Sequence, residues 1–139
     1  MKEKLKERLP LVILCLIFCG MTVFWGLRNK SNLQRNHQLT IGTIEDCENG
    51  GGRGNAGRIY LSYTFSVDGK NYNAQSTYFS TEISYFDGVK FFVGKKFPVM
   101  YYPQNPSNAS ILITPKNFTR WGYSFPDSLN WVLQYLPKP

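Results

Sequence analysis

The sequence is poor in the side chains that catalytic and metal-binding sites use most often. It has one histidine, His37, and three cysteines, of which Cys15 and Cys19 lie in an apolar run near the N-terminus. Because Cys47 is alone in the rest of the chain, no disulfide can form there, and the fold depends on an apolar core. A Cys–His or Ser–His mechanism would have to recruit His37 from beside the apolar run. The sequence therefore predicts no catalytic residue and no enzyme activity.

Patterns that bind metals or nucleotides are missing or incomplete. The acidic residues within Glu45–Glu48 match no known metal-ligand spacing. The stretch "GRGNAG", Gly52–Gly57, fits G-x-G-x-x-G, but a strand pattern follows it where a dinucleotide site needs a helix. Arg58-Ile59 also stands where a P-loop needs Lys followed by Ser or Thr. We predict no metal and no cofactor, although a pair of carboxylates acting as acid and base stays open.

Negative charge is scarce, and the excess of positive charge is unevenly placed. The chain has 16 Lys and Arg against 9 Asp and Glu, a net charge of +7. Residues 1–37 carry +5 of this and the remainder only +2. A nucleic-acid-binding protein would carry a basic face on its folded domain. We therefore predict no nucleic-acid partner, and basic flanks that favour anionic lipid headgroups instead.

One long hydrophobic run, Pro10–Leu27, has no charged residue in 18 positions. As a helix it is about 27 Å long, close to the roughly 30 Å hydrocarbon core of a bilayer. A cleaved signal peptide is the alternative, but the run is longer than a usual signal core and no small-residue cleavage site follows. We predict a transmembrane helix at residues 10–27, in contact with the lipid bilayer, after a basic tail at residues 1–9.

The charges beside this helix favour one orientation weakly. Four Lys and Arg precede it and three follow soon after it. The positive-inside rule then favours a cytoplasmic N-terminus and a C-terminal domain outside the cytoplasm. We expect a bacterial protein that crosses the cytoplasmic (inner) membrane once.

After a polar juxtamembrane linker at residues 28–38, residues 39–114 read as a small β-domain. Alternating apolar residues predict strands at Leu39–Glu48 and at Ile59–Val67, and an Asp68-Gly69 type I′ turn joins the second of these to a returning strand. Pro98 predicts a strand that starts at, or lies along, a sheet edge. The fold class is mainly β: a small antiparallel β-sandwich or partly open barrel. One or two short helices accompany it, the first within Thr81–Lys96 and ended by Gly94.

Residues 115–139 form an aromatic C-terminal extension with an amphipathic helix. Asp127 is placed to cap it, and Leu129, Val132, Leu133 and Leu136 share one helical face. Trp131 and Tyr135 form an aromatic stripe beside that face. The helix either closes the open end of the β-domain or lies on the membrane or on a partner.

Three stretches carry a family resemblance over about residues 41–113. They are "IGTIEDC", "YLSYTFSVDGKNY" and "VGKKFPVMYYPQNPSNASIL". The chain resembles an uncharacterised bacterial family, the domain of unknown function 3592, in which a V-D-G-K hairpin precedes a Y-x-P-x-N-P turn. Here the acidic residue often found between the last Tyr and the Pro is absent. The resemblance implies a membrane-attached β-domain and no catalytic residues.

Aromatic residues are abundant, and several fall outside the expected core pattern. Tyr and Trp give large contact areas at low entropic cost and favour protein interfaces. The candidate contacts are Tyr60, Tyr78, Tyr102, Trp121, Tyr123, Trp131 and Tyr135. We therefore expect a protein-binding module, either a subunit of an envelope complex or an immunity-type protein that neutralises a toxin. A membrane-bound enzyme of unknown reaction and a purely structural membrane subunit are the alternatives.

Overall fold

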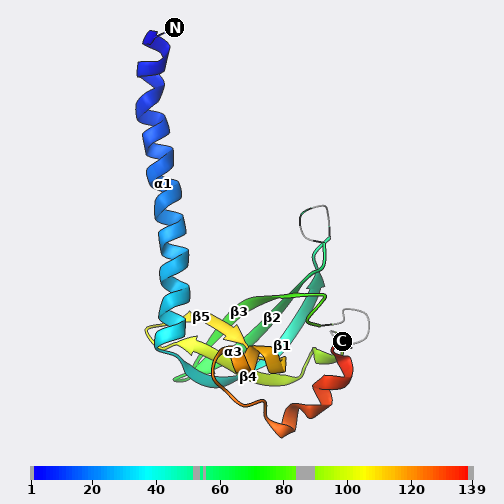
Figure 1. Ribbon diagram of the computed structural model, residues 1–139. Coiled ribbons are helices and arrows are strands. Elements are labelled where there is room, and N and C mark those ends of the chain that lie inside the picture. Colours follow the sequence, from blue (N-terminus) through cyan, green and yellow to red (C-terminus); the bar gives the residue numbers. More distant parts are fainter. Residues whose placement is uncertain (1, 52–53, 55, 84–89, 138–139) are drawn as a thin grey trace.

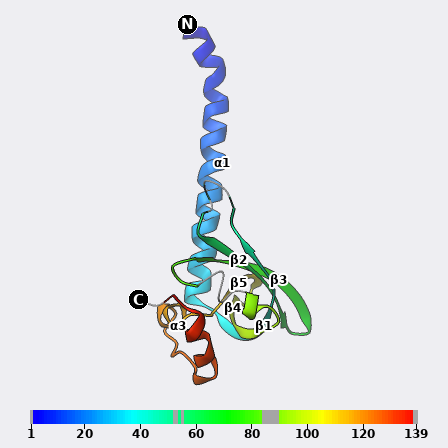
Figure 2. The ribbon, with the colours of Figure 1, turned by 90° about the vertical axis from the view of Figure 1, so that its right-hand side faces the viewer.

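The computed structural model describes residues 2–51, 54, 56–83 and 90–137, with side chains from Ile13 onward. A long helix stands on one side of a small β-barrel, and short helices cover the barrel (Figures 1 and 2). In chain order the elements are α1 (Lys2–Arg35), β1 (Gln38–Asn49), β2 (Arg58–Val67), β3 (Lys70–Phe79), α2 (Lys90–Phe92), β4 (Lys96–Tyr102), β5 (Asn105–Ile111), α3 (Pro115–Arg120) and the 3₁₀ helix η2 (Asp127–Tyr135).

The five strands form one antiparallel sheet in the order β3-β2-β1-β4-β5. The sheet curls until its edge strands β3 and β5 lie beside each other. Side chains join them: the Tyr78 hydroxyl donates to the Ile111 carbonyl at 2.6 Å, and the Ile111 N–H donates to Ser76 Oγ at 3.4 Å. Of the two predicted architectures, the domain is therefore the partly open barrel.

Strand β1 makes the curl possible because it pairs with both halves of the sheet. Its first part pairs with β4 and its second part with β2, with a bulge between Ile44 and Asp46. Gly42 lies where the two ladders overlap. A Cβ added there would lie 2.6 Å from Val99 Cγ2 and 3.0 Å from the Thr64 carbonyl. The close approach of β1 to the core thus requires glycine at this position.

The β2–β3 hairpin confirms the strongest sequence prediction. Asp68 and Gly69 have φ angles of 50° and 77°, as a turn with two left-handed residues requires. Four of the five residues predicted to face inward, Ile59, Leu61, Tyr63 and Phe65, are buried. The turn residues and the alternation of apolar and polar residues were therefore sufficient to predict this hairpin.

The prediction for Pro98 was wrong, because β4 is an inner strand between β1 and β5. Pro98 lies opposite Ile41 of β1, and its carbonyl accepts the Leu112 N–H at 2.8 Å. The N and C=O of one residue point to the same neighbouring strand in an antiparallel ladder. The Pro98 nitrogen therefore faces the side of β5, and β5 ends at Ile111, before it would need an N–H from Pro98.

Helix α1 is longer than the predicted membrane span. The stretch predicted as a linker, residues 28–38, is helical as far as Arg35. These last turns pack on the barrel: Leu33 is buried, and Asn108 Nδ2 donates to the Asn29 carbonyl at 2.7 Å. By length and composition, Ile13–Arg35 is able to cross a membrane.

The C-terminal extension packs against the barrel, as the first of the two alternatives predicted. Thr114 and Asn117 form a capping box that starts α3. The ring of Trp131 in η2 lies 5.9 Å from the rings of both Phe92 and Phe97. In Figure 1, η2 (red) lies at the side of the barrel opposite to α1, and in Figure 2 it lies below the foot of α1.

Two details of η2 differ from the prediction. Asp127 is its first residue and not its cap; the N-cap is Pro126, which makes no side-chain cap bond. A 3₁₀ helix has three residues per turn. Leu129 and Val132 therefore face the core, whereas Leu133 is turned outward and is 46% exposed.

The region predicted as a short helix is only partly described, since residues 84–89 lie outside the described part of the chain. Its final turn is α2, and Gly94 ends it with a φ of 78°. The Gly94 N–H donates to the Ile44 carbonyl at 2.7 Å, which fastens this turn to β1.

Candidate functional site

One surface depression is a groove of about 540 Å³ between α2 and η2, here called the distal groove. Its volume is within the range of ligand and peptide pockets. The helix η2, which flanks it and is red in Figure 1, lies on the side of the barrel away from α1. The groove is lined by Phe91, Lys95, Lys96, Ser128, Leu129, Trp131 and Tyr135.

Aromatic rings form one wall of the distal groove. Phe91 and Tyr135 are stacked at 5.2 Å with 24° between their planes. Behind them, Trp131 meets Tyr135 edge to face at 6.2 Å and rests on buried Phe92. Because Phe91 is 56% exposed, the wall combines a fixed base with an accessible ring.

Two basic side chains also line the groove. Lys95 and Lys96 are both exposed, and no described residue makes an ion pair with either of them. The Lys95 carbonyl accepts the Ile44 N–H at 3.1 Å, so the backbone that carries the two lysines is fixed to β1. Among the described lining residues there is no carboxylate, histidine or cysteine.

Of the seven aromatic residues predicted as contacts, the structure brings two together in this groove, Trp131 and Tyr135. Tyr78 instead belongs to the core: it is 3% exposed and its hydroxyl bonds to Ile111. Burial raises the pKa of Tyr78 well above its usual range, so the hydroxyl stays protonated. Tyr60 and Tyr102 are half-buried elsewhere, and the Tyr102 hydroxyl donates to Gln104 at 2.6 Å.

Trp121 and Tyr123 surround the single histidine at the base of α1. His37 Nδ1 lies 3.0 Å from the Leu33 carbonyl and Nε2 lies 2.7 Å from the Tyr123 hydroxyl. The carbonyl can only accept, so Nδ1 carries a proton and donates to it. The Trp121 ring packs edge-on at 5.9 Å. These contacts make His37 a link between α1 and the extension.

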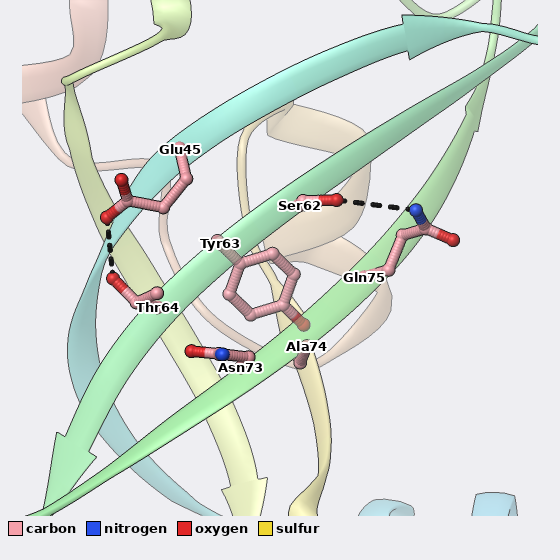
Figure 3. A pocket seen from close by; sticks show the side chains of 7 residues that line it. All are labelled: Glu45, Ser62, Tyr63, Thr64, Asn73, Ala74 and Gln75. Atoms are coloured by element: carbon pink, nitrogen blue, oxygen red, sulfur yellow. Dashed lines mark hydrogen bonds between the residues drawn. The ribbon is translucent and has the colours of Figure 1, made fainter.

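A second depression, of about 450 Å³, lies on the outer face of the sheet (Figure 3). Its side chains are mainly hydroxyls and amides that bond to each other. Thr64 Oγ1 donates to Glu45 at 2.7 Å, and Gln75 Nε2 donates to Ser62 at 3.3 Å. The ring of Tyr63 points behind the sheet, where its hydroxyl meets Ser76 at 3.1 Å. This face has the character of a solvated strand surface.

Cys47, the one cysteine of the barrel, is not poised as a nucleophile. Partial burial, and then the carboxylates of Asp46 and Glu48, raise its pKa to about 11. Near neutral pH it is therefore a thiol, and the reactive thiolate is rare. Within the described residues, no group of three His, Cys, Asp or Glu side chains is placed to hold a metal ion.

Five of the seven lining residues were not predicted as contacts. Ser128 and Leu129 belong to η2 itself, and the other three are Phe91, Lys95 and Lys96. They lie in "KFFVGKK", about 35 residues before η2 in the chain. The doubled aromatic followed by two lysines was a visible signal. Only the tertiary fold, however, brings it to Trp131 and Tyr135.

Comparison with known proteins gives one match. Neither the curated proteins nor the solved structures include a match to this chain. Residues 40–116 match the family described as Domain of unknown function (DUF3592), which covers the barrel and the start of α3. This range is more than half of the 139 residues. The chain therefore belongs to the DUF3592 family.

Proposed function

We propose that this chain is a single-pass membrane protein whose barrel binds another protein through the distal groove. The observation that carries the proposal is the exposed Phe91 ring, stacked on Tyr135 beside two lysines that form no ion pair with a described residue. Aromatic anchors held in place by a packed base, with charges at the rim, are typical of protein interfaces.

The exposed surface of α1 supports the membrane anchor. Apolar side chains are exposed on all sides of the described part of the helix, and no other element covers them. They are Ile13, Leu14, Leu16, Ile17, Phe18, Met21, Val23, Phe24, Trp25 and Leu27. An apolar surface of this extent is unfavourable in water and favourable in lipid.

The charge of the groove suggests the chemistry of the partner. Lys95 and Lys96 would attract a segment that carries carboxylates, and the aromatic wall would accept an apolar or aromatic side chain. Because the described lining residues include no carboxylate, histidine or thiol, we propose binding without catalysis.

The membrane and the side of the barrel are part of the proposal. We place the chain in a bacterial cytoplasmic membrane with the barrel outside the cytoplasm, on the basis of the charges that flank α1. Because η2, which flanks the distal groove, lies away from α1 in Figure 1, we place the groove on the side of the barrel away from the bilayer. A subunit of an envelope complex or an incoming toxin is the partner class that this position favours.

Site-specific photo-crosslinking tests the groove. A photoreactive phenylalanine derivative replaces Phe91 in one variant and Ile41, on the outer face of β1, in a control. The two positions are matched, because both side chains are apolar and 56% exposed. We expect a crosslinked protein adduct from position 91 alone. Adducts from position 41 alone, or none from either position in cells, contradict the proposal.

Charge reversal at the lysines provides an independent test. Lys95→Glu with Lys96→Glu should abolish the adduct formed from position 91, because an acidic partner would be repelled. Lys70→Glu with Lys116→Glu, at exposed positions outside the groove, makes the same change in net charge. An equal loss in both double variants would show that net charge, and not the groove, governs the association.

A further inference from the structure

A second cleft, of about 450 Å³, lies between the base of α1 and the barrel. We call it the juxtamembrane cleft. Strands β3 and β5 and helix α3 form its barrel side. Its α1 side is formed by Gly26, Asn29, Lys30 and Leu33, which recur at the three- and four-residue spacing of one helix face. The cleft is independent of the distal groove.

The position of this cleft along α1 corresponds to the headgroup layer of a bilayer. The apolar run ends at Leu27, and Lys30 lies about 4.5 Å further along the helix axis. The headgroup region of one leaflet is roughly 5–7 Å thick. When α1 spans the membrane, Gly26 therefore lies at the edge of the hydrocarbon and Lys30 among the headgroups. Trp121, which borders the cleft, is a residue type that favours this interface.

The cleft has an excess of positive charge. Lys30 and Arg120 line it, and Glu82 is the one acidic residue among its described lining residues. Both oxygens of Glu82 are engaged: Oε1 lies 4.0 Å from Lys116 Nζ, and Oε2 accepts the Phe79 N–H at 3.3 Å. No described residue forms an ion pair with Lys30 or Arg120.

An apolar surface continues from the cleft into the membrane. Phe18, Met21, Thr22 and Trp25 border a shallow groove of about 330 Å³ along α1. Thr22 lies one turn before Gly26, so the groove and the cleft share one side of the helix. A molecule with an anionic head and an apolar tail fits this combination of surfaces.

We infer that the juxtamembrane cleft binds the headgroup of one anionic phospholipid. The ammonium of Lys30 and the guanidinium of Arg120 donate to the phosphate oxygens, and the acyl chain lies along the groove on α1. This inference rests on the proposed insertion of α1 in the membrane. It does not depend on a protein partner at the distal groove.

Native mass spectrometry of the full-length protein in detergent tests the inference. The probes are phosphatidylglycerol and the zwitterionic phosphatidylcholine, supplied in equal amounts. The wild-type protein should retain phosphatidylglycerol preferentially. Lys30→Gln and Arg120→Gln should each lower that retention about tenfold, the effect of losing one hydrogen bond between charged groups. Arg120→Lys should retain more lipid than Arg120→Gln.

Arg28→Gln is the matched control. It removes the same charge two residues from Lys30, but at 100° per residue it lies on the opposite side of the helix. A loss as large as that of Lys30→Gln would show general attraction to an anionic surface and overturn the inference. So would equal retention of the two lipids by the wild-type protein.

Two further measurements separate the remaining explanations. Displacement of phosphatidylglycerol by millimolar inorganic phosphate would show a site for free phosphate and overturn the lipid assignment. Resistance of the protein to carbonate extraction from the same membranes reports insertion of α1. Inserted protein without a lipid preference refutes the cleft alone, whereas extracted protein refutes the anchor as well.

Discussion

Replacing Leu129 by alanine should destabilise the barrel far more than replacing Leu133, although both leucines lie in η2. In an α-helix the two residues would share one face, as the sequence pattern predicts. A 3₁₀ helix has three residues per turn, so residues four positions apart point in different directions. Leu129 is 6% exposed, whereas Leu133 is 46% exposed. The pair therefore tests both the helix type and the packing of the extension on the barrel.

The expected difference is large enough to measure. Removing a buried leucine side chain costs about 2–5 kcal/mol, which includes the cavity left behind. Substitution at an exposed position without special contacts changes stability by about 0.5 kcal/mol or less. A domain of this size has a free energy of unfolding of about 5–15 kcal/mol. Leu129→Ala should therefore remove a substantial part of the stability, and Leu133→Ala little of it.

Urea unfolding of the full-length protein in mild detergent micelles, followed by near-ultraviolet circular dichroism, measures both variants. This signal reports the packed aromatic rings around Trp131. Equal losses of several kcal/mol would show that η2 presents an α-helical face to the core. Losses below about 0.5 kcal/mol in both variants would show that η2 does not pack on the barrel.

Three other substitutions or reactions test separate parts of the structure. Gly42→Ala should lower the free energy of unfolding by about 1–3 kcal/mol, because the new methyl group overlaps Val99; unchanged stability would contradict the close strand approach. Alkylation of Cys47 at pH 8, with the other two cysteines replaced by serine, should be about tenfold slower in the folded than in the unfolded protein, because its pKa is raised from 9.0 to about 11 and the lower thiolate fraction is partly offset by the higher nucleophilicity of a more basic thiolate. The folded-state rate should rise as the pH approaches 11, and equal rates at pH 8 would refute the shift. Tyr123→Phe should cost about 0.5–1.5 kcal/mol through loss of its bond to His37, measured by the same urea titration.

Features that depend on neighbouring residues could be predicted from the sequence. The Asp68-Gly69 turn needs only two residues that accept a positive φ, and the alternation of β2 needs only its own ten positions. The apolar run likewise contains its own evidence, because length and lack of charge are local properties. The family resemblance, seen over about residues 41–113, correctly indicated the family, whose match spans residues 40–116.

Features that depend on distant contacts could not be predicted in this way. Pro98 suggested an edge strand, but the place where β5 ends determines whether its missing N–H matters. The polar sequence of residues 28–35 suggested a linker, but packing of Leu33 and a bond from Asn108 stabilise those turns as helix. Tyr78 was expected to be a surface contact, but its hydroxyl donates to the Ile111 carbonyl inside the barrel. The sequence gives no sign of this contact, because the two residues lie in different strands.

The candidate site shows the same division. Trp131 and Tyr135 were identified because they form a stripe at one-turn spacing. Phe91 and Lys95 come from α2 and the turn that follows it. The hydrogen bond from the Gly94 N–H to the Ile44 carbonyl of β1 helps to hold this segment beside η2. Aromatic residues that are close in the sequence can thus be identified as part of a groove. The lining residues from a distant segment can be identified only from the fold.

Cysteine labelling in intact cells that express the protein tests most directly whether α1 carries the barrel across the membrane. Asn130 is exposed on η2 and does not line the distal groove, so Asn130→Cys, with the native cysteines replaced by serine, reports the side on which the barrel lies. A membrane-impermeant maleimide should label the protein before lysis, and the protein should sediment with the membranes. Labelling only after lysis would place the barrel in the cytoplasm, and recovery in the soluble fraction would show that α1 does not anchor the chain.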